Sequence, residues 1–158
     1  MDFQIGDKVI HSTYGLGEIV FIEEKIIHDR PTNCYVFRTN DLTIWIPIDE
    51  LHQNSLRMPT LPNEFKSLFS ILTSPGEPLP EDRALRKDQL IEHMKNGQLK
   101  SICQVVRDLT HFKRIKKLND QEKSILERAT NSLLTEWIYS LGVSRAQAEH
   151  AMMQLLNE

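Results

Sequence analysis

A stretch near the start of the chain joins two short, alternating apolar runs through a turn that carries two glycines. Residues 3–19 have the sequence FQIGDKVIHSTYGLGEI. Here Val9 can point inward, Gly15 and Gly17 fall where the chain reverses, and Ile19 resumes the strand. Glycine adopts the backbone angles that a tight reversal requires, and alternation is typical of a half-buried strand. The chain is therefore constrained to begin as a small, sharply bent β-barrel.

Two further apolar runs complete the predicted barrel. Residues 35–37 are YVF, and residues 42–46 are LTIWI, directly followed by a proline. Together with the first stretch they predict a five-stranded SH3-like or Tudor-like module. Modules of this kind usually bind other macromolecules, which favours an adaptor over an enzyme.

The last of these runs carries a candidate binding residue. If Ile44 and Ile46 point into the barrel, the alternation of a strand turns Trp45 outward. Pro47 cannot donate a backbone hydrogen bond, so it belongs at a strand end or a sheet edge. An outward tryptophan at an edge suits recognition by strand addition or by an aromatic anchor. The alternative is that Trp45 packs on the rest of the chain and joins its two halves.

The pattern changes character at the proline-containing segment RMPTLP, residues 57–62. The apolar period is close to two before this segment and close to 3.6 after it. We expect an α+β protein with a barrel domain over residues 1–60 and a compact domain of about five helices over residues 63–158. The expected helices cover residues 63–72, residues 81–95, a stretch from 99 to 109, a helix opened by Asn119 with Glu122 in a capping box, and a helix opened by Ser144 with Gln147.

The chain lacks the signals of a membrane or secreted protein. No apolar run approaches the roughly 20 residues that span a bilayer, and the first residues lack the order of a signal peptide. Cys34 and Cys103 are too far apart in the sequence to suggest a disulfide framework, and we expect both to be small buried hydrophobic residues. These observations predict a cytoplasmic protein without a membrane partner.

Patterns for catalysis are missing as well. The sequence contains no phosphate-binding loop, no GxSxG elbow and no HExxH pair, and its six histidines are scattered without ligand spacing. Glu23 and Glu24 are adjacent in a predicted strand, so they face opposite sides and cannot form an acid–base pair. We expect no enzyme activity, no cofactor, no bound metal and no small-molecule substrate.

Charge is distributed unevenly along an acidic chain of formal net charge −3. Residues 82–117 hold ten basic and four acidic side chains. Two groups stand out within this segment: Arg83, Arg86 and Lys87 at helical spacing, and Lys113, Arg114, Lys116 and Lys117 in a predicted link. Such groups suit contact with DNA phosphates, although a run of charge is usually only a solvated face.

Several motifs resemble the CarD/CdnL family of bacterial transcription regulators. In the first half these are FQIGDKVI at residues 3–10 and DLTIWIP at residues 41–47. In the second half they are MKNG at 94–97, VVRDL at 105–109 and LNDQEK at 118–123. The resemblance extends along essentially the whole chain, and the first half also resembles the polymerase-interacting module of transcription-repair coupling factors.

The resemblance implies a Tudor-like domain that docks on the β subunit of bacterial RNA polymerase and a helical domain that reaches promoter DNA. In the family the helical domain contacts the upstream edge of the opening bubble and stabilises the open complex. The positions that would face the polymerase correspond here to Lys25, Arg38, Trp45 and Pro47. DNA binding by the free protein is expected to be weak.

The chain departs from the family pattern at one position. Many members carry a tryptophan that wedges at the melted DNA edge, and its place here is taken by Arg83. The family carries a basic pair just after this position; the corresponding residues here are Leu85 and Arg86, of which only Arg86 is basic. At the next position that is basic in the family this chain has Asp88, with Lys87 beside it. An arginine can stack on a base or hold a phosphate, but it supplies no apolar wedge. Two functions therefore remain open: a polymerase-bound regulator that contacts DNA, and a polymerase-bound adaptor whose helical domain binds another protein.

Overall fold

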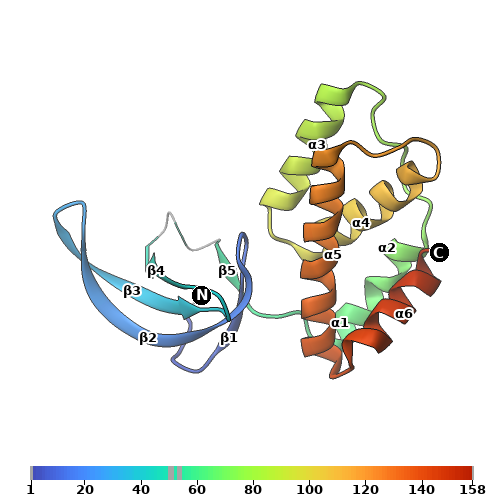
Figure 1. Ribbon diagram of the computed structural model, residues 1–158. Coiled ribbons are helices and arrows are strands. Elements are labelled where there is room, and N and C mark those ends of the chain that lie inside the picture. Colours follow the sequence, from blue (N-terminus) through green and yellow to red (C-terminus); the bar gives the residue numbers. More distant parts are fainter. Residues whose placement is uncertain (1, 50–51, 53–54, 158) are drawn as a thin grey trace. The chain divides into compact units, whose positions relative to one another are not determined.

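The computed structural model describes residues 2–49, 52 and 55–157 (Figure 1). The chain divides into two compact units, Met1–Pro59 and Thr60–Glu158. We call them the β unit and the α unit. A five-stranded sheet followed by a set of helices confirms the α+β prediction.

The β unit is a single antiparallel sheet. Its strands are β1 (Lys8–His11), β2 (Gly15–Ile27), β3 (Arg30–Arg38), β4 (Thr43–Pro47) and β5 (Leu56–Arg57). They pair in the order β4-β3-β2-β1-β5, so β4 and β5 are the two ends of the described sheet. The prediction that Pro47 lies at a strand end or a sheet edge is confirmed, because it is the last residue of β4, which is an edge strand of the described sheet.

The two glycines of the first hairpin have different roles. Gly15 has a positive φ of 77°, which suits glycine, and it follows the turn at residues 12–14. Gly17 instead lies within β2, opposite Val9. A Cβ atom at Gly17 would stand 2.5 Å from the Phe37 ring and 2.7 Å from the carbonyl oxygen of Arg38. The expectation that Gly17 serves the reversal was therefore wrong, because its small size is needed for packing.

This contact makes Gly17→Ala a test of the β-unit core. We expect the substitution to destabilise the β unit by about 1 to 3 kcal/mol, because the added methyl group has to displace the buried Phe37 ring or the β3 backbone. Hydrogen exchange of the β1–β3 amides in the full chain measures the effect in that unit alone. Glu24→Ala, at an exposed position of the same strand, is the matched control. Equal protection in the two variants would contradict this account of Gly17.

The α unit begins with two short helices where one was predicted. The observed segments are α1 (Pro62–Ser67) and α2 (Phe69–Thr73), separated at Leu68. The Leu68 amide donates to the Phe65 carbonyl, three residues back, which tightens the turn at the break. Phe65 and Phe69, one on each side of the break, both pack against the ring of Trp137, with centroid distances of 5.4 and 4.9 Å.

The longer helices begin and end at local signals. They are α3 (Arg83–Lys95), α4 (Leu99–Lys113), α5 (Asp120–Leu141) and α6 (Arg145–Leu155). The predicted capping box at Asn119 with Glu122 is present, and the helix predicted to start at Ser144 and Gln147 opens with a capping box as well. Helix α5 ends at Gly142 in the left-handed conformation.

Both cysteines are buried, as predicted, one in each unit. Burial raises the pKa of the Cys34 thiol, and it raises the pKa of Cys103 to about 12. A thiol with so high a pKa is protonated at neutral pH and is a poor nucleophile. No helix in the described part of the chain combines the length and the apolar character that a membrane crossing requires.

Candidate functional site

One face of the sheet in the β unit lies opposite the main hydrophobic cluster; its centre, at Cys34 and Val36, is buried, and its surroundings are exposed. The register places Phe21 beside Val36 and Val36 beside Trp45, and these residues share a face because side chains alternate along a strand. The core side chains Tyr35, Phe37 and Ile46 occupy the opposite face. We call the first surface the Trp45 face; the register assigns to it Phe21, Glu23, Lys25, Cys34, Val36, Arg38, Trp45 and Pro47.

All four residues that were predicted to contact a polymerase belong to the Trp45 face. Lys25 comes from β2, Arg38 from β3, and Trp45 and Pro47 from β4. Trp45 has 38% of its surface exposed, which agrees with its predicted outward direction. The register thus gathers residues that are up to 22 positions apart in the sequence, although their role stays a prediction.

A β-bulge in β2 creates this arrangement. Ile19 pairs with Phe37 while Phe21 pairs with the next residue, Val36, so Val20 is an extra residue on β2. The extra residue shifts the alternation by one position. Ile19 is consequently buried in the core, whereas Phe21 lies on the Trp45 face with 56% of its surface exposed.

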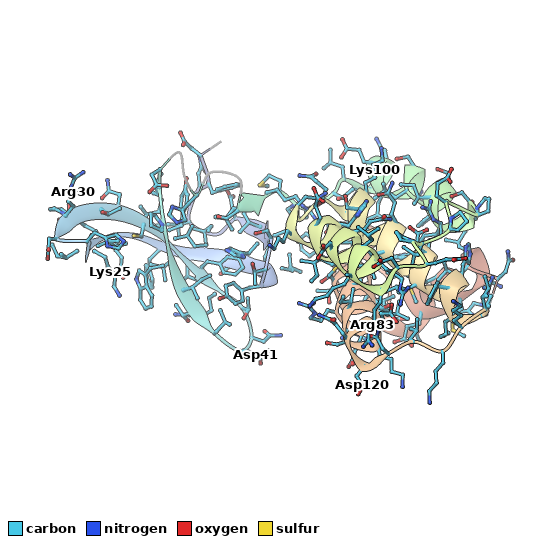
Figure 2. All side chains as sticks on the ribbon, turned by 90° about the horizontal axis from the view of Figure 1, so that it is seen from above. Lys25, Arg30, Asp41, Arg83, Lys100 and Asp120 are labelled. Atoms are coloured by element: carbon cyan, nitrogen blue, oxygen red, sulfur yellow. The ribbon has the colours of Figure 1, made fainter. Side chains whose placement is uncertain are left out.

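Two charged side chains hold the indole of Trp45 in place. Its Nε1 donates a hydrogen bond to Glu23 Oε1 at 2.5 Å, and Lys25 Nζ lies 3.8 Å from the ring centroid. Figure 2 shows Lys25 among the side chains of this sheet. A cation over the ring and a hydrogen bond to its edge restrict the tryptophan rotamer before any partner binds. The sequence alone did not reveal the places of Glu23 and Phe21, because both depend on the pairing of β2 with β3.

In the α unit, Arg83 and Lys87 form a second candidate surface. Both are exposed in the first turns of α3, and they line a pocket of about 360 Å³ together with Asn119 and Gln121 at the start of α5. Figure 2 shows Arg83 and Asp120 on the α unit. We call this surface the Arg83 pocket. Two exposed cations beside amide side chains can hold an anionic group such as a phosphate.

Arg86 does not belong to that surface, contrary to the prediction. Only 8% of its surface is exposed, and its Nε donates to Glu122 Oε2 of α5 in a buried ion pair. Its Nη1 donates to the carbonyl oxygens of Pro80 and Glu81 at 3.1 Å, and the guanidinium lies 4.7 Å from the ring centroid of Phe112. The spacing in the sequence suggested a shared face, but the carboxylate 36 residues away turns Arg86 into the interior.

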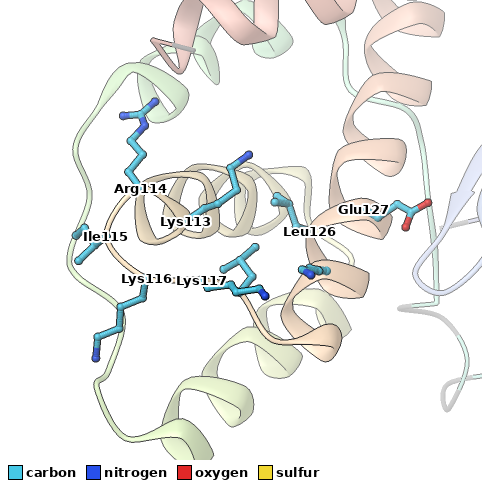
Figure 3. A pocket seen from close by; sticks show the side chains of 9 residues that line it. Lys113, Arg114, Ile115, Lys116, Lys117, Leu126 and Glu127 are labelled. Carbon is cyan, nitrogen blue, oxygen red and sulfur yellow. The ribbon is translucent and has the colours of Figure 1, made fainter.

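Lys113 and Arg114 lie elsewhere, in a pocket of about 610 Å³ beside the loop between α4 and α5 (Figure 3). Arg114 Nη2 donates to the carbonyl oxygens of Leu156 and Asn157, which ties the loop to the end of α6. The predicted DNA-contacting residues are thus divided: Arg83 and Lys87 line one pocket, Lys113 and Arg114 line another, and Arg86 is buried. The described residues contain no group of His, Cys, Asp and Glu that could hold a metal ion.

The buried ion pair predicts a difference between two neighbouring arginines. Arg86→Ala should lower the free energy of unfolding of the α unit by about 3 to 5 kcal/mol, because it leaves the Glu122 carboxylate buried without its charge partner. Arg83→Ala removes the same charge from an exposed position and should change stability by no more than about 0.5 kcal/mol. Urea denaturation followed by circular dichroism at the helix band measures both. Equal stabilities would show that the ion pair does not hold the unit together.

Comparison with known proteins covers both units of the chain. Residues 3–58 match the family model for the CarD-like/TRCF RID domain, and residues 67–153 match the model for the CarD C-terminal domain. YdeB of Bacillus subtilis (strain 168), a protein named as a transcription factor, is 31% identical over 151 residues, which cover 92% of this chain and 96% of that protein. The order of the two matched domains is the order of the β and α units. The chain belongs to the CarD family.

Proposed function

We propose that this protein is a transcription regulator that docks on the β subunit of bacterial RNA polymerase and modulates the stability of the open promoter complex. The Trp45 face supplies the docking surface, and the α unit supplies the DNA contact. The observation that carries the proposal is the exposed, pre-positioned indole of Trp45 within the region that matches the RID domain model. The proposed site of action is the bacterial cytoplasm, and no catalytic step or cofactor is assigned.

The chemistry of the Trp45 face suits a protein partner. Phe21 and Trp45 offer aromatic surface, and Lys25 and Arg38 add positive charge next to it. Tryptophan and arginine are the side chains that most often dominate the energy of an interface. Because Glu23 and Lys25 already fix the indole, little side-chain entropy is lost when a partner covers it. Positive charge around the anchor favours a partner surface with carboxylates.

The edge of the sheet offers a second element of recognition. Among the described strands β4 pairs with β3 alone, so its outer edge is open to an added strand. Pro47 ends that edge because it has no N–H to donate. A strand of the polymerase that pairs there would run directly beside Trp45. The two modes of recognition can therefore act together.

The proposed DNA contact rests on Arg83 and Lys87, which are exposed in the first turns of α3. Phosphate contacts by these cations are independent of sequence and weaken with added salt. Arg86 acts as a positioning residue, since its pair with Glu122 fixes the start of α3 against α5. The net charge of −3 makes binding to free DNA weak, and docking on the polymerase raises the local DNA concentration. The DNA contact of Lys113 and Arg114 stays a prediction.

Removing the indole tests the docking surface. Trp45→Ala should weaken binding to core polymerase at least about 30-fold, because loss of an interface aromatic costs on the order of 2 kcal/mol or more. Surface plasmon resonance with immobilised core polymerase measures the dissociation constant. Tyr139→Ala removes an exposed aromatic ring from α5 and should bind as the unaltered protein does. Glu23→Gln, which weakens the hold on the indole, should give an intermediate loss.

A Trp45→Ala variant that binds normally would remove the Trp45 face from the proposal. The amide spectrum of the variant distinguishes this result from unfolding. A well-dispersed set of β-unit resonances shows that the sheet is intact.

Charge removal from the Arg83 pocket tests the DNA contact. Arg83→Ala combined with Lys87→Ala should leave polymerase binding intact and shorten the lifetime of the open promoter complex, because two phosphate contacts are lost. Arg83→Trp should lengthen that lifetime by supplying an apolar wedge. Lys95→Ala combined with Lys100→Ala is the matched control, since it removes the same charge from exposed positions outside the pocket.

The lifetime is measured as the decay of heparin-resistant complexes on a promoter fragment. If neither change at Arg83 alters it while polymerase binding persists, the Arg83 pocket does not act on DNA. The adaptor function would then replace the DNA contact in the proposal.

A further inference from the structure

The loop between α4 and α5 exposes an isoleucine in the middle of a cluster of cations. Ile115 has 81% of its surface exposed, at the edge of the open pocket of about 610 Å³. Leu126, half-buried on α5, contributes further apolar surface to the same pocket. Figure 3 shows the side chains around this space, from the end of α4, the loop and α5. We call it the Ile115 pocket. An isoleucine in this position gives the isolated fold almost no hydrophobic stabilisation.

The backbone around Ile115 is fixed by hydrogen bonds. The amides of Ile115 and Lys116 both donate to the Phe112 carbonyl, at 3.0 and 2.9 Å, so the end of α4 closes into a tight turn. Arg114 ties this turn to α6 through the carbonyls of Leu156 and Asn157. Ile115 is thus presented by a constrained turn. A surface that is already ordered loses little entropy when a partner binds.

The lysines of the pocket do not stabilise α5, the helix that begins beside them. Lys116 and Lys117 precede α5, and Lys123 follows its first turn. Cations near a helix N-terminus gain nothing from the helix dipole, which favours anions at that end. In the described part of the chain these three side chains form no ion pair. Positive charge is concentrated here although the whole chain carries a net charge of −3.

We infer that the Ile115 pocket binds an acidic, amphipathic segment of a second protein. Carboxylates of the segment lie against Lys116, Lys117 and Lys123, and an apolar side chain packs between Ile115 and Leu126. The phosphates of a DNA backbone complement the cations but leave the Ile115 side chain exposed to water. DNA would therefore account for the charges of the pocket and not for its apolar surface. A small ligand is normally enclosed for most of its area, whereas this pocket is open to solvent along one side.

The inference goes beyond the proposed function, because it concerns residues outside both the Trp45 face and the Arg83 pocket. The test uses the whole 158-residue chain, labelled with 15N, and three probes. The first probe is a short synthetic peptide with leucines at positions i and i+4 among glutamates. The second has serines in place of the leucines, and the third is a DNA duplex. Amide shifts locate each binding site, and fluorescence anisotropy of labelled probes gives each dissociation constant.

The leucine peptide should bind and shift the amides of residues 113–118 and 123–127. The serine peptide should bind at least about tenfold more weakly, because no apolar side chain is buried. Ile115→Gln should reduce binding of the leucine peptide by a similar factor, whereas Met153→Gln, an exposed apolar position on α6, should not. Lys116→Gln combined with Lys117→Gln should weaken binding and reduce its dependence on salt.

Three results would overturn the inference. The first is that neither peptide binds, and the second is that both bind equally well. The third is that DNA binds the same residues more tightly than the leucine peptide and is insensitive to Ile115→Gln, which would make the loop a DNA contact. The third result would support the predicted DNA contact of Lys113 and Arg114, which line the same pocket. None of the three results concerns Trp45 or Arg83, so the roles proposed for those residues are tested separately.

Discussion

The buried ion pair between Arg86 and Glu122 determines how the α unit presents its surfaces. Glu122 uses one carboxylate oxygen to cap the start of α5 through the Asn119 amide and the other to accept from Arg86. Arg86 in turn satisfies two carbonyls that precede α3. One ion pair therefore joins the starts of two helices, and the cost of its desolvation is offset by hydrogen bonds on both partners. The Arg83 pocket is the groove between the helix ends that this pair holds together.

Both units restrain the surfaces that carry their exposed candidate residues, but they use different means. In the β unit a carboxylate and an ammonium group act on the indole of Trp45 directly. In the α unit the restraint acts on the backbone, through Arg86 at the start of α3 and through Arg114 at the turn after α4. Arginine serves both anchoring positions because its planar fork of donors can bond several carbonyl or carboxylate oxygens at once. The cations that remain exposed are then available to a ligand.

The sequence predicted those features that depend on nearby residues. The capping box at Asn119 and the helix start at Ser144 each depend on residues within four positions of chain, and the outward direction of Trp45 follows from the alternation of its own strand. The burial of Arg86 could not be predicted in this way, because its carboxylate partner is 36 residues distant. The role of Gly17 likewise depends on a ring from another strand. The sequence thus pointed to the candidate residues, whereas the burial or exposure of each side chain depends on tertiary contacts.

The bulge at Val20 divides β2 into two parts whose side chains lie in different environments. Ile19, before the bulge, is packed in the core, while Phe21, Glu23 and Lys25, after it, face outward. Substitutions at these three positions can therefore alter the Trp45 face without changing the volume of the core. One inserted residue thus lets a single strand contribute to the core before the bulge and to the exposed Trp45 face after it.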